Sequence, residues 1–248
     1  MKKTIIILLI FINGNLLFSQ TVDFQKAEYE LISEYQNYRN SDYDIRFDSL
    51  RAKLKIQIEN ILCDSNSFDY PFDSLSNYVT IIKSNDNKVR MFSWDELTGG
   101  TWHDMAVIIQ FKISNRKIKT QWIDSDISEE PAGITDDILY KIYDVDIKKQ
   151  PHYLCFGWGT YGAGHHHNSI LIFSIENDSL KVCSDCIEKN YSIIKAPRSK
   201  KIDMKFNKVE NIISFNEFEY NDESGFYIPT GKRVKLKLKT GKYRKYDD

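Results

Sequence analysis

The sequence predicts a mainly β protein made of three repeated four-stranded antiparallel meanders, preceded by an N-terminal helical hairpin. Three observations predict this fold class. Apolar residues recur at helical spacing near the N-terminus, short β-branched and aromatic runs follow from residue 78 onward, and some of these runs match at a separation of about 62 residues. Four-stranded meanders build propeller-like assemblies, sandwiches and irregular barrels, and the sequence leaves these three arrangements open.

The helical hairpin is predicted over residues 23–62, where apolar side chains return every three or four residues and share one helix face. Asp23 is the expected N-cap, because its carboxylate can accept hydrogen bonds from the free amides of the first turn. The polar residues 40–42 separate two apolar stripes, which we expect to cover the rest of the fold. These stripes are Phe24, Ala27, Leu31, Tyr35 and Tyr38, then Phe47, Leu50, Leu54, Ile58 and Ile61.

Twelve short runs rich in β-branched and aromatic residues follow, with turn-forming residues between them. Runs spaced in this way are typical of antiparallel β proteins. The predicted strands cover residues 78–83, 88–94, 105–113, 117–122, 138–147, 152–158, 169–175, 179–183, 201–206, 209–218, 233–239 and 242–246.

The runs also repeat. Residues 111–119 match residues 173–181 without a gap, and the Phe-x-Trp segment at 92–94 matches the one at 156–158. A weaker third copy begins at Phe215. This spacing predicts three units of about 60 residues with four strands each. Because the two rings of a Phe-x-Trp segment lie on one face of a strand, we expect both to pack into a core.

The first residues resemble an export signal. Lys2 and Lys3 precede an apolar run at residues 4–12, and the small residue Ser19 lies where a signal peptidase could cut to leave Gln20. The run is too short to span a bilayer, and we expect no transmembrane helix in the mature chain. The sequence therefore predicts a protein exported by a signal peptide to the periplasm or the extracellular space.

These features divide the chain into a signal peptide (residues 1–19), a helical hairpin packed on the β domain (residues 20–70) and a β-rich repeat domain (residues 71–248). The full chain has 34 basic and 35 acidic residues, and loss of two lysines with the signal leaves a formal net charge of −3. So mild a charge argues against nucleic acid as a partner.

Four of the five histidines lie in two glycine-containing segments, each between a Phe-x-Trp strand and the next strand. Equivalent loops of a repeat fold usually emerge on one side, so His103 and His165–His167 are expected to lie near one another. Imidazole and carboxylate groups are ligands that zinc and similar ions prefer. The sequence therefore predicts a divalent metal such as zinc bound by His103, Asp104, His165 and His167. The alternative interpretation is that these are exposed loop histidines, and the sequence establishes no cofactor.

The cysteines allow several roles. Cys183 and Cys186 have C-x-x-C spacing, while Cys63 and Cys155 stand alone. In an exported protein a disulfide or structural role is the first interpretation, a metal site the second and redox catalysis the third. The sequence does not determine how the four cysteines pair. Cys155 matches Met91 in the repeat, so we expect it to fill a core position.

The C-terminal segment 232–245 is strongly basic, and lysines alternate with apolar residues over 235–239. This alternation gives a strand with one basic face and one apolar face. The lysines either protect an edge strand against aggregation or contact an anionic surface such as a polysaccharide. Carboxylates beside Trp94 and Trp122 suggest glycoside hydrolysis, but no separation between two carboxylates is defined.

These features predict an exported, non-enzymatic β-rich protein that binds a ligand or partner through the loops carrying His103 and His165–His167. The partner is expected to be a cell-envelope surface or a polysaccharide. The alternative is a metal-dependent hydrolase of the cell envelope or extracellular space that uses His103, His165 and His167. The sequence lacks H-E-x-x-H, G-x-S-x-G, P-loop and dinucleotide motifs, so it does not decide whether the protein is an enzyme.

Overall fold

A computed structural model describes residues 22–41, 45–98, 100–114, 117–123, 136–162 and 164–246. Over these residues, two N-terminal helices precede three antiparallel sheets, none of which closes into a barrel. The predicted mainly β fold class with three four-stranded meanders is confirmed, and the arrangement is consistent with a sandwich. The signal peptide predicted at residues 1–19 lies outside the described residues and stays a prediction.

The two helices are α1 (Phe24–Arg39) and α2 (Ile45–Leu62). Asp23 caps α1, because its carboxylate accepts a hydrogen bond from the Lys26 amide at 3.1 Å. The short 3-10 helices η1 (Ser65–Asp69) and η2 (Leu75–Asn77) then lead into the first sheet. In the part of the chain that the structure describes, no helix is long and apolar enough to cross a membrane.

In each four-stranded meander, strands that follow one another in the chain are hydrogen-bonded neighbours. The first sheet contains β1 (Thr80–Lys83), β2 (Val89–Asp95), β3 (Met105–Ser114) and β4 (Lys117–Ile123). The second contains β5 (Ile138–Ile147), β6 (Gln150–Tyr161), β7 (His165–Glu176) and β8 (Ser179–Val182), with β9 (Ile193–Pro197) added beside β7. The third contains β10 (Lys205–Asn207), β11 (Ile212–Asn221), β12 (Phe226–Lys239) and β13 (Lys242–Lys245). Two further 3-10 helices, η4 (Ser184–Cys186) and η5 (Lys189–Tyr191), lie between β8 and β9.

The sequence repeat corresponds to a structural repeat. Residues 111–119 span the last two strands of the first sheet, and residues 173–181 span the equivalent β7 and β8. Both Phe-x-Trp segments lie in the second strand of their sheets, β2 and β6. Asn177 and Asp178 form the two-residue turn between β7 and β8 with φ of 49° and 60°, the positive values that a type I′ hairpin turn requires.

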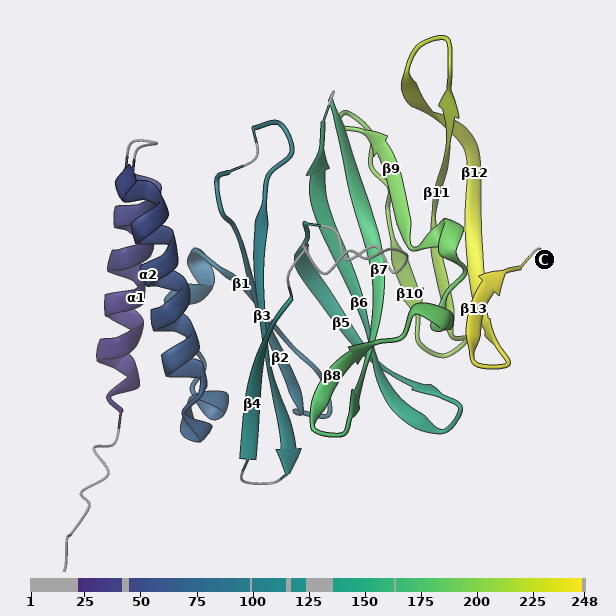
Figure 1. Cartoon of the computed structure of the whole chain (residues 1–248). Coiled ribbons are helices and arrows are strands. Elements are labelled where there is room, and N and C mark those ends of the chain that lie inside the picture. Colours follow the sequence, from purple (N-terminus) through teal and green to yellow (C-terminus); the bar gives the residue numbers. More distant parts are fainter. Residues whose placement is uncertain are drawn as a thin grey trace, which may run out of the picture.

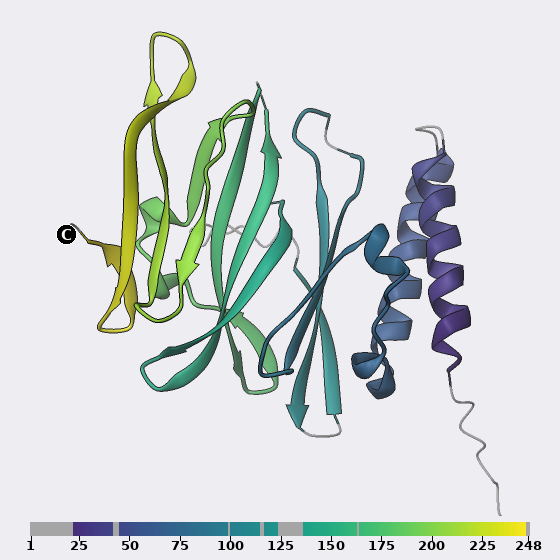
Figure 2. The same ribbon diagram turned by 180° about the vertical axis from the view of Figure 1, so that it is seen from behind.

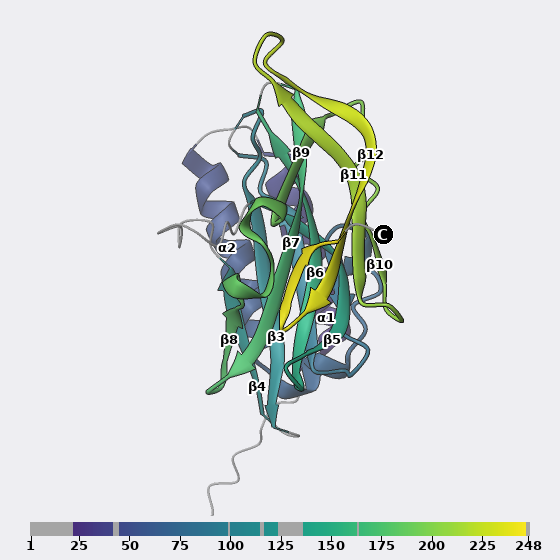
Figure 3. The same ribbon diagram turned by 90° about the vertical axis from the view of Figure 1, so that its right-hand side faces the viewer.

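The layers stack in chain order, with the helices against the first sheet, the second sheet in the middle and the third sheet outermost (Figures 1 and 2). Viewed from the third sheet, β12 and β13 lie in front of β6 and β7, so the sheets overlie one another face to face (Figure 3). A separate buried apolar cluster fills each of the three spaces between layers. Members of these clusters are Leu31, Leu54 and Phe92; Met91, Ile109 and Leu171; and Phe156, Phe215 and Leu236.

Strand alternation explains how one sheet contributes to two cores. On β2, Val89 and Met91 belong to the core shared with the second sheet, whereas Phe92 and Trp94 belong to the core beneath the helices. The expectation that both rings of a Phe-x-Trp segment are buried is correct for β2. It is wrong for β6, where Trp158 is exposed because it lies near the end of the strand, beyond the cluster that buries the other ring of its segment.

Candidate functional site

Three loops, one from each sheet, lie at the same end of the stack (top of Figure 1). They are the β2–β3 loop at residues 96–104, the β6–β7 turn at Gly162 and Gly164, and the tip of the β11–β12 hairpin at residues 222–225. We call these three loops, together with residues 197–200 after β9, the loop end. The segments that carry the predicted histidines therefore emerge on one side of the fold.

Hydrogen bonds join the segments of the loop end. The His103 amide donates to the Thr160 hydroxyl at 2.6 Å. The Arg198 guanidinium donates to the carbonyl oxygens of Thr101 and His165 at 2.8 Å and 3.1 Å. These bonds connect the β2–β3 loop to the second sheet and to the segment after β9, so these parts of the loop end support one another.

His103 and Asp104 make separate hydrogen bonds. The Nδ1 atom of His103 lies 2.7 Å from a carboxylate oxygen of Asp95, and the imidazole remains partly exposed. The Asp104 carboxylate accepts a hydrogen bond from the Thr98 hydroxyl at 2.5 Å. A carboxylate at one ring nitrogen fixes the orientation of an imidazole, so Asp95 positions His103 at the surface.

His167 lies inside the fold, beneath the loop end. Its Nε2 atom is 2.9 Å from one carboxylate oxygen of Asp137, and the other oxygen accepts a hydrogen bond from the Ser169 hydroxyl at 2.6 Å. The side chains of His167 and Asp137 are each only 1% exposed. The serine hydroxyl is bonded to the carboxylate and not to the imidazole, which differs from a serine nucleophile activated by histidine.

Two glycines of β6 make room for this polar cluster. Gly157 and Gly159 pair with Ser169 and His167 on β7. A Cβ atom at Gly159 would lie 2.1 Å from the carbonyl oxygen of Asp136 and 2.5 Å from the imidazole of His167, and one at Gly157 would lie 2.3 Å from the Ser169 hydroxyl. Any larger residue would therefore displace the buried cluster.

His165 packs under the hairpin of the third sheet. Its ring centroid lies 5.0 Å from that of Phe226 and 5.6 Å from that of Tyr227, and its side chain is buried. The Nδ1 atom lies 3.3 Å from the carbonyl oxygen of Gly162. The alternative interpretation of exposed loop histidines is therefore wrong for His165 and for His167.

His166 points away from these two and lies between Trp158 and Lys200. The indole N–H of Trp158 donates to Nδ1 of His166 at 3.0 Å, and Nε2 lies 2.8 Å from the carbonyl oxygen of Lys200. Since a carbonyl only accepts, the arrangement fits a neutral ring that carries its hydrogen on Nε2. Burial lowers the pKa of His166 from its ordinary value of 6.5.

This lowered pKa predicts that the fold loses stability on acidification. The His166 imidazole binds a proton more readily in the unfolded chain than in the folded chain. The neutral side chain therefore makes its full contribution to the free energy of unfolding above about pH 6.5, and this contribution decreases as the pH falls below that value. His166→Gln keeps one donor and one acceptor without a titrating group. We expect the melting temperature of the variant to fall less between pH 7.5 and pH 5 than that of the wild type. Equal falls would contradict the prediction.

The structure does not gather the four predicted metal ligands into one group of ligand atoms. Within the described residues, the group of at least three side chains whose ligand atoms lie within 4.8 Å of one another is a different set. That set consists of His152, Cys183 and Cys186. Metal binding by the predicted set, His103, Asp104, His165 and His167, stays a prediction.

Cys183 and Cys186 form a disulfide with their Cα atoms 5.4 Å apart, in agreement with the first interpretation of the C-x-x-C segment. Cys63 is a free, exposed thiol, and Cys155 is a free, buried one. The sulfur of Cys155 lies 3.7 Å from that of Met91, its partner in the repeat, and burial raises the pKa of the Cys155 thiol. Cys155 thus fills a core position, as expected.

Next to the loop end, a groove of 470 Å³ opens between η5, β9 and the third sheet. Its apolar lining includes Tyr191, Phe215, Phe218 and Tyr227, and Tyr227 also contacts His165. The volume is within the range of small-molecule sites. The groove therefore offers apolar surface that adjoins the predicted binding loops.

The basic alternating segment lies in β12, between β11 and β13. The edge-strand interpretation is therefore wrong for residues 235–239, whereas the edge strand of this sheet, the four-residue β13, carries the basic residues Lys242, Arg244 and Lys245 of the same segment. Leu236 belongs to the core, so alternation places Lys235 and Lys237 on the outer face of the third sheet. Lys237 lies over the Tyr246 ring, with its nitrogen 5.2 Å from the ring centroid.

Comparisons of this chain with protein-family models, curated proteins and solved structures found no match. The function proposed below therefore depends on the geometry of the site and on the sequence.

Proposed function

We propose that this chain is an exported, non-enzymatic protein that binds a cell-envelope polysaccharide through the loop end, which contains His103 and adjoins His165–His167 on β7. The observation that carries the proposal is a pair of indole rings that are exposed and yet held in place. Trp102 lies in the β2–β3 loop and is 38% exposed, and Trp158 near the end of β6 is 39% exposed.

Each indole is fixed by its own N–H group. Trp102 donates to a carboxylate oxygen of Asp136 at 3.1 Å, and Trp158 donates to His166 at 3.0 Å. A ring that is already held loses little conformational freedom when a ligand packs on it. The C–H face of a sugar ring is apolar and can stack on such an indole face, while the sugar hydroxyls bond to neighbouring polar groups.

The position of the polar cluster supports a binding role over an enzymatic one. His167, Asp137 and Ser169 are the grouping at this end that most resembles catalytic residues, and all three are buried. A polysaccharide chain that lies on the loop end would not contact them. The export signal predicted at residues 1–19 supports the same proposal, because an exported chain would meet the polysaccharides of the envelope.

The test uses the mature chain from Gln20 and three insoluble polysaccharides: chitin, cellulose and peptidoglycan sacculi. We expect the wild type to be retained on at least one of them. Trp102→Ala and Trp158→Ala are each expected to weaken retention by about tenfold or more, because an aromatic anchor at the centre of an interface contributes about 2 kcal/mol. Sedimentation of the bound fraction at increasing polysaccharide gives the affinity.

Tyr29→Ala is the matched control, because Tyr29 is an exposed aromatic residue on α1, which is not part of the loop end. Its retention should equal that of the wild type. Retention that is unchanged in both tryptophan variants, or reduced equally in the Tyr29 variant, would show that the loop end is not the binding surface. His167 is unsuitable for this test, because its substitution would disturb the buried cluster.

A further inference from the structure

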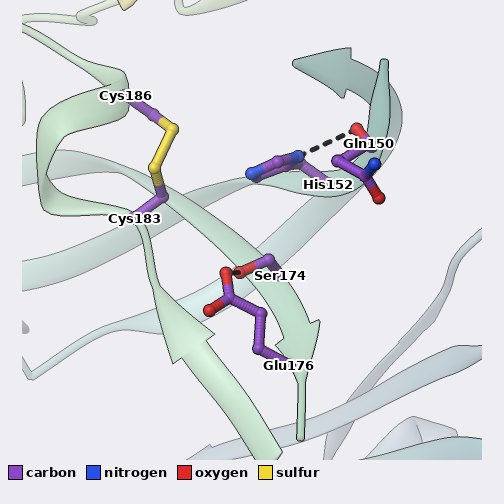
Figure 4. The surroundings of a disulfide bond; sticks show 6 residues. All are labelled: Gln150, His152, Ser174, Glu176, Cys183 and Cys186. Atoms are coloured by element: carbon purple, nitrogen blue, oxygen red, sulfur yellow. Dashed lines mark hydrogen bonds between the residues drawn. A yellow bond between two sulfur atoms is a disulfide. The ribbon is translucent and has the colours of Figure 1, made fainter. Parts of the chain in front are cut away.

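His152, Cys183 and Cys186 come together on the second sheet from two distant parts of the chain. His152 lies near the start of β6, Cys183 follows β8, and Cys186 ends η4. Their potential ligand atoms, one imidazole nitrogen and two sulfurs, lie within 4.8 Å of one another. Figure 4 shows the imidazole of His152 directed at the Cys183–Cys186 disulfide.

A backbone hydrogen bond sets the tautomer of His152. Its Nδ1 atom lies 3.0 Å from the carbonyl oxygen of Gln150. A carbonyl can only accept, so Nδ1 carries the hydrogen and, in the neutral ring, Nε2 has a lone pair. Figure 4 shows this second nitrogen on the side of the ring that faces the sulfurs. Histidines that bind metals are commonly oriented by just such a bond from the other ring nitrogen.

Backbone hydrogen bonds hold the C-x-x-C turn without help from the disulfide. The Cys183 amide donates to the carbonyl oxygen of Ile172 on β7 at 2.8 Å, and the Cys186 amide donates to that of Cys183 at 3.2 Å. After the turn, the Glu188 amide donates to the carbonyl oxygen of Tyr243 at 3.1 Å. The two sulfurs are therefore expected to stay near His152 when the bond between them is broken.

The local backbone disfavours redox catalysis at this turn. A catalytic C-x-x-C lies at the start of a helix, whose positive end stabilises the thiolate. Here Ile187 follows η4 in extended conformation, with φ of −138° and ψ of 149°. The second interpretation of the segment, a metal site, has the stronger support.

We propose that Cys183, Cys186 and His152 bind Zn²⁺ once the disulfide is reduced. A dithiol reductant gives two electrons and two protons to the disulfide and itself becomes a disulfide. Zn²⁺ then displaces the two thiol protons to solvent and is held by two thiolates and the Nε2 atom of His152. A water molecule completes the four-coordinate geometry, in which two ligands lie about 3.5 Å apart, so small side-chain movements are sufficient. The oxidised protein cannot bind the ion in this way.

The experiment measures Zn²⁺ binding to the mature chain, purified without a histidine tag, by competition with a chromophoric zinc indicator. Protein treated with a dithiol reductant, then freed from it under anaerobic conditions, is compared with oxidised protein. We expect the reduced form to bind one more equivalent of Zn²⁺ than the oxidised form. Cys183→Ser should abolish this additional binding, and His152→Gln should weaken it at least tenfold.

Two matched controls separate this site from others. Cys63→Ser removes an exposed free thiol, and His103→Gln removes a histidine of the predicted loop-end site. Neither should change the affinity of the site that forms on reduction. A spectrum of the reduced wild type with Co²⁺ gives a check that needs no substitution, because sulfur-to-cobalt charge-transfer absorption reports bound thiolates. Equal binding by both redox forms, absence of that absorption, or full affinity in the folded His152 variant would overturn the proposal.

Discussion

Replacement of Asp137 by alanine is expected to lower the free energy of unfolding by about 3–5 kcal/mol, because it removes one partner from a buried, hydrogen-bonded pair. The carboxylate of Asp137 accepts from Ser169 at 2.6 Å and lies 2.9 Å from Nε2 of His167. Its removal deprives a buried hydroxyl and a buried imidazole of the carboxylate that they contact. Urea unfolding followed by tryptophan fluorescence measures the change.

Asp146→Ala is the control for this variant, since Asp146 is an aspartate with an exposed side chain on β5, the strand that directly follows Asp137. We expect that control to differ from the wild type by less than about 0.5 kcal/mol. Asp137→Asn keeps the shape of the side chain but has a single acceptor oxygen, so its loss should be intermediate. A loss of less than about 1 kcal/mol for Asp137→Ala would mean that the cluster does not contribute to stability as the geometry indicates.

Arg90→Met is expected to be destabilising by a similar amount, about 3–5 kcal/mol, for a different reason. Arg90 lies on β2 beneath the helices and is buried. Its guanidinium donates to the carbonyl oxygens of Ser67 and Tyr70 at 2.6 Å each and to the Gln110 amide oxygen at 2.8 Å. These carbonyls belong to the irregular segment around η1 and would lose their donor in the interior.

Aromatic rings surround the same guanidinium, whose carbon lies 5.4 Å, 5.1 Å and 4.9 Å from the ring centroids of Phe68, Phe72 and Phe92. Burial lowers the pKa of Arg90 to about 10, so the group remains a cation at neutral pH and can interact with the ring faces. Arg244→Met, at an exposed position of β13, is the control for urea unfolding. Equal stability of both methionine variants would contradict the expectation.

Local patterns were sufficient to predict the helices and most strands. The apolar stripes placed the hairpin over residues 23–62, and the helices occupy Phe24–Arg39 and Ile45–Leu62. Periodicity succeeds here because each helix buries one continuous face against the first sheet. The repeat also identified equivalent strands, since matched segments occupy the same place in each meander.

The strand β9 was not predicted, because it forms in response to an unpaired edge of another strand, β7, and not from a strong pattern in its own residues. β8 pairs only with the last residues of β7, from Phe173 to Glu176. The first half of β7, from His165 to Ser169, is left with a free edge, and β9 pairs along it. A five-residue run is a weak local signal, and its place in the sheet depends on the length of a neighbouring strand.

The contacts of the candidate sites depend on register and were missed for the same reason. Asp137 meets His167 because β5 and β7 lie on either side of β6. His152 meets the C-x-x-C turn because it lies on β6 near the point where the chain leaves β8. Nothing in the spacing of these residues along the sequence indicates such partners. The pairing of Cys183 with Cys186, in contrast, joins residues of one turn and could be anticipated.

The layered arrangement raises the question of why the stack ends after three sheets. An exposed apolar face of a sheet would favour packing of another sheet against it, from the same chain or from a second molecule. At one terminus, α1 and α2 cover the first sheet, as a polar capping repeat does in a solenoid. At the other, Lys235 and Lys237 replace apolar side chains on the outward face of β12. Neither outer face of the stack therefore favours the addition of a further sheet, because helices cover one face and lysine side chains lie on the other.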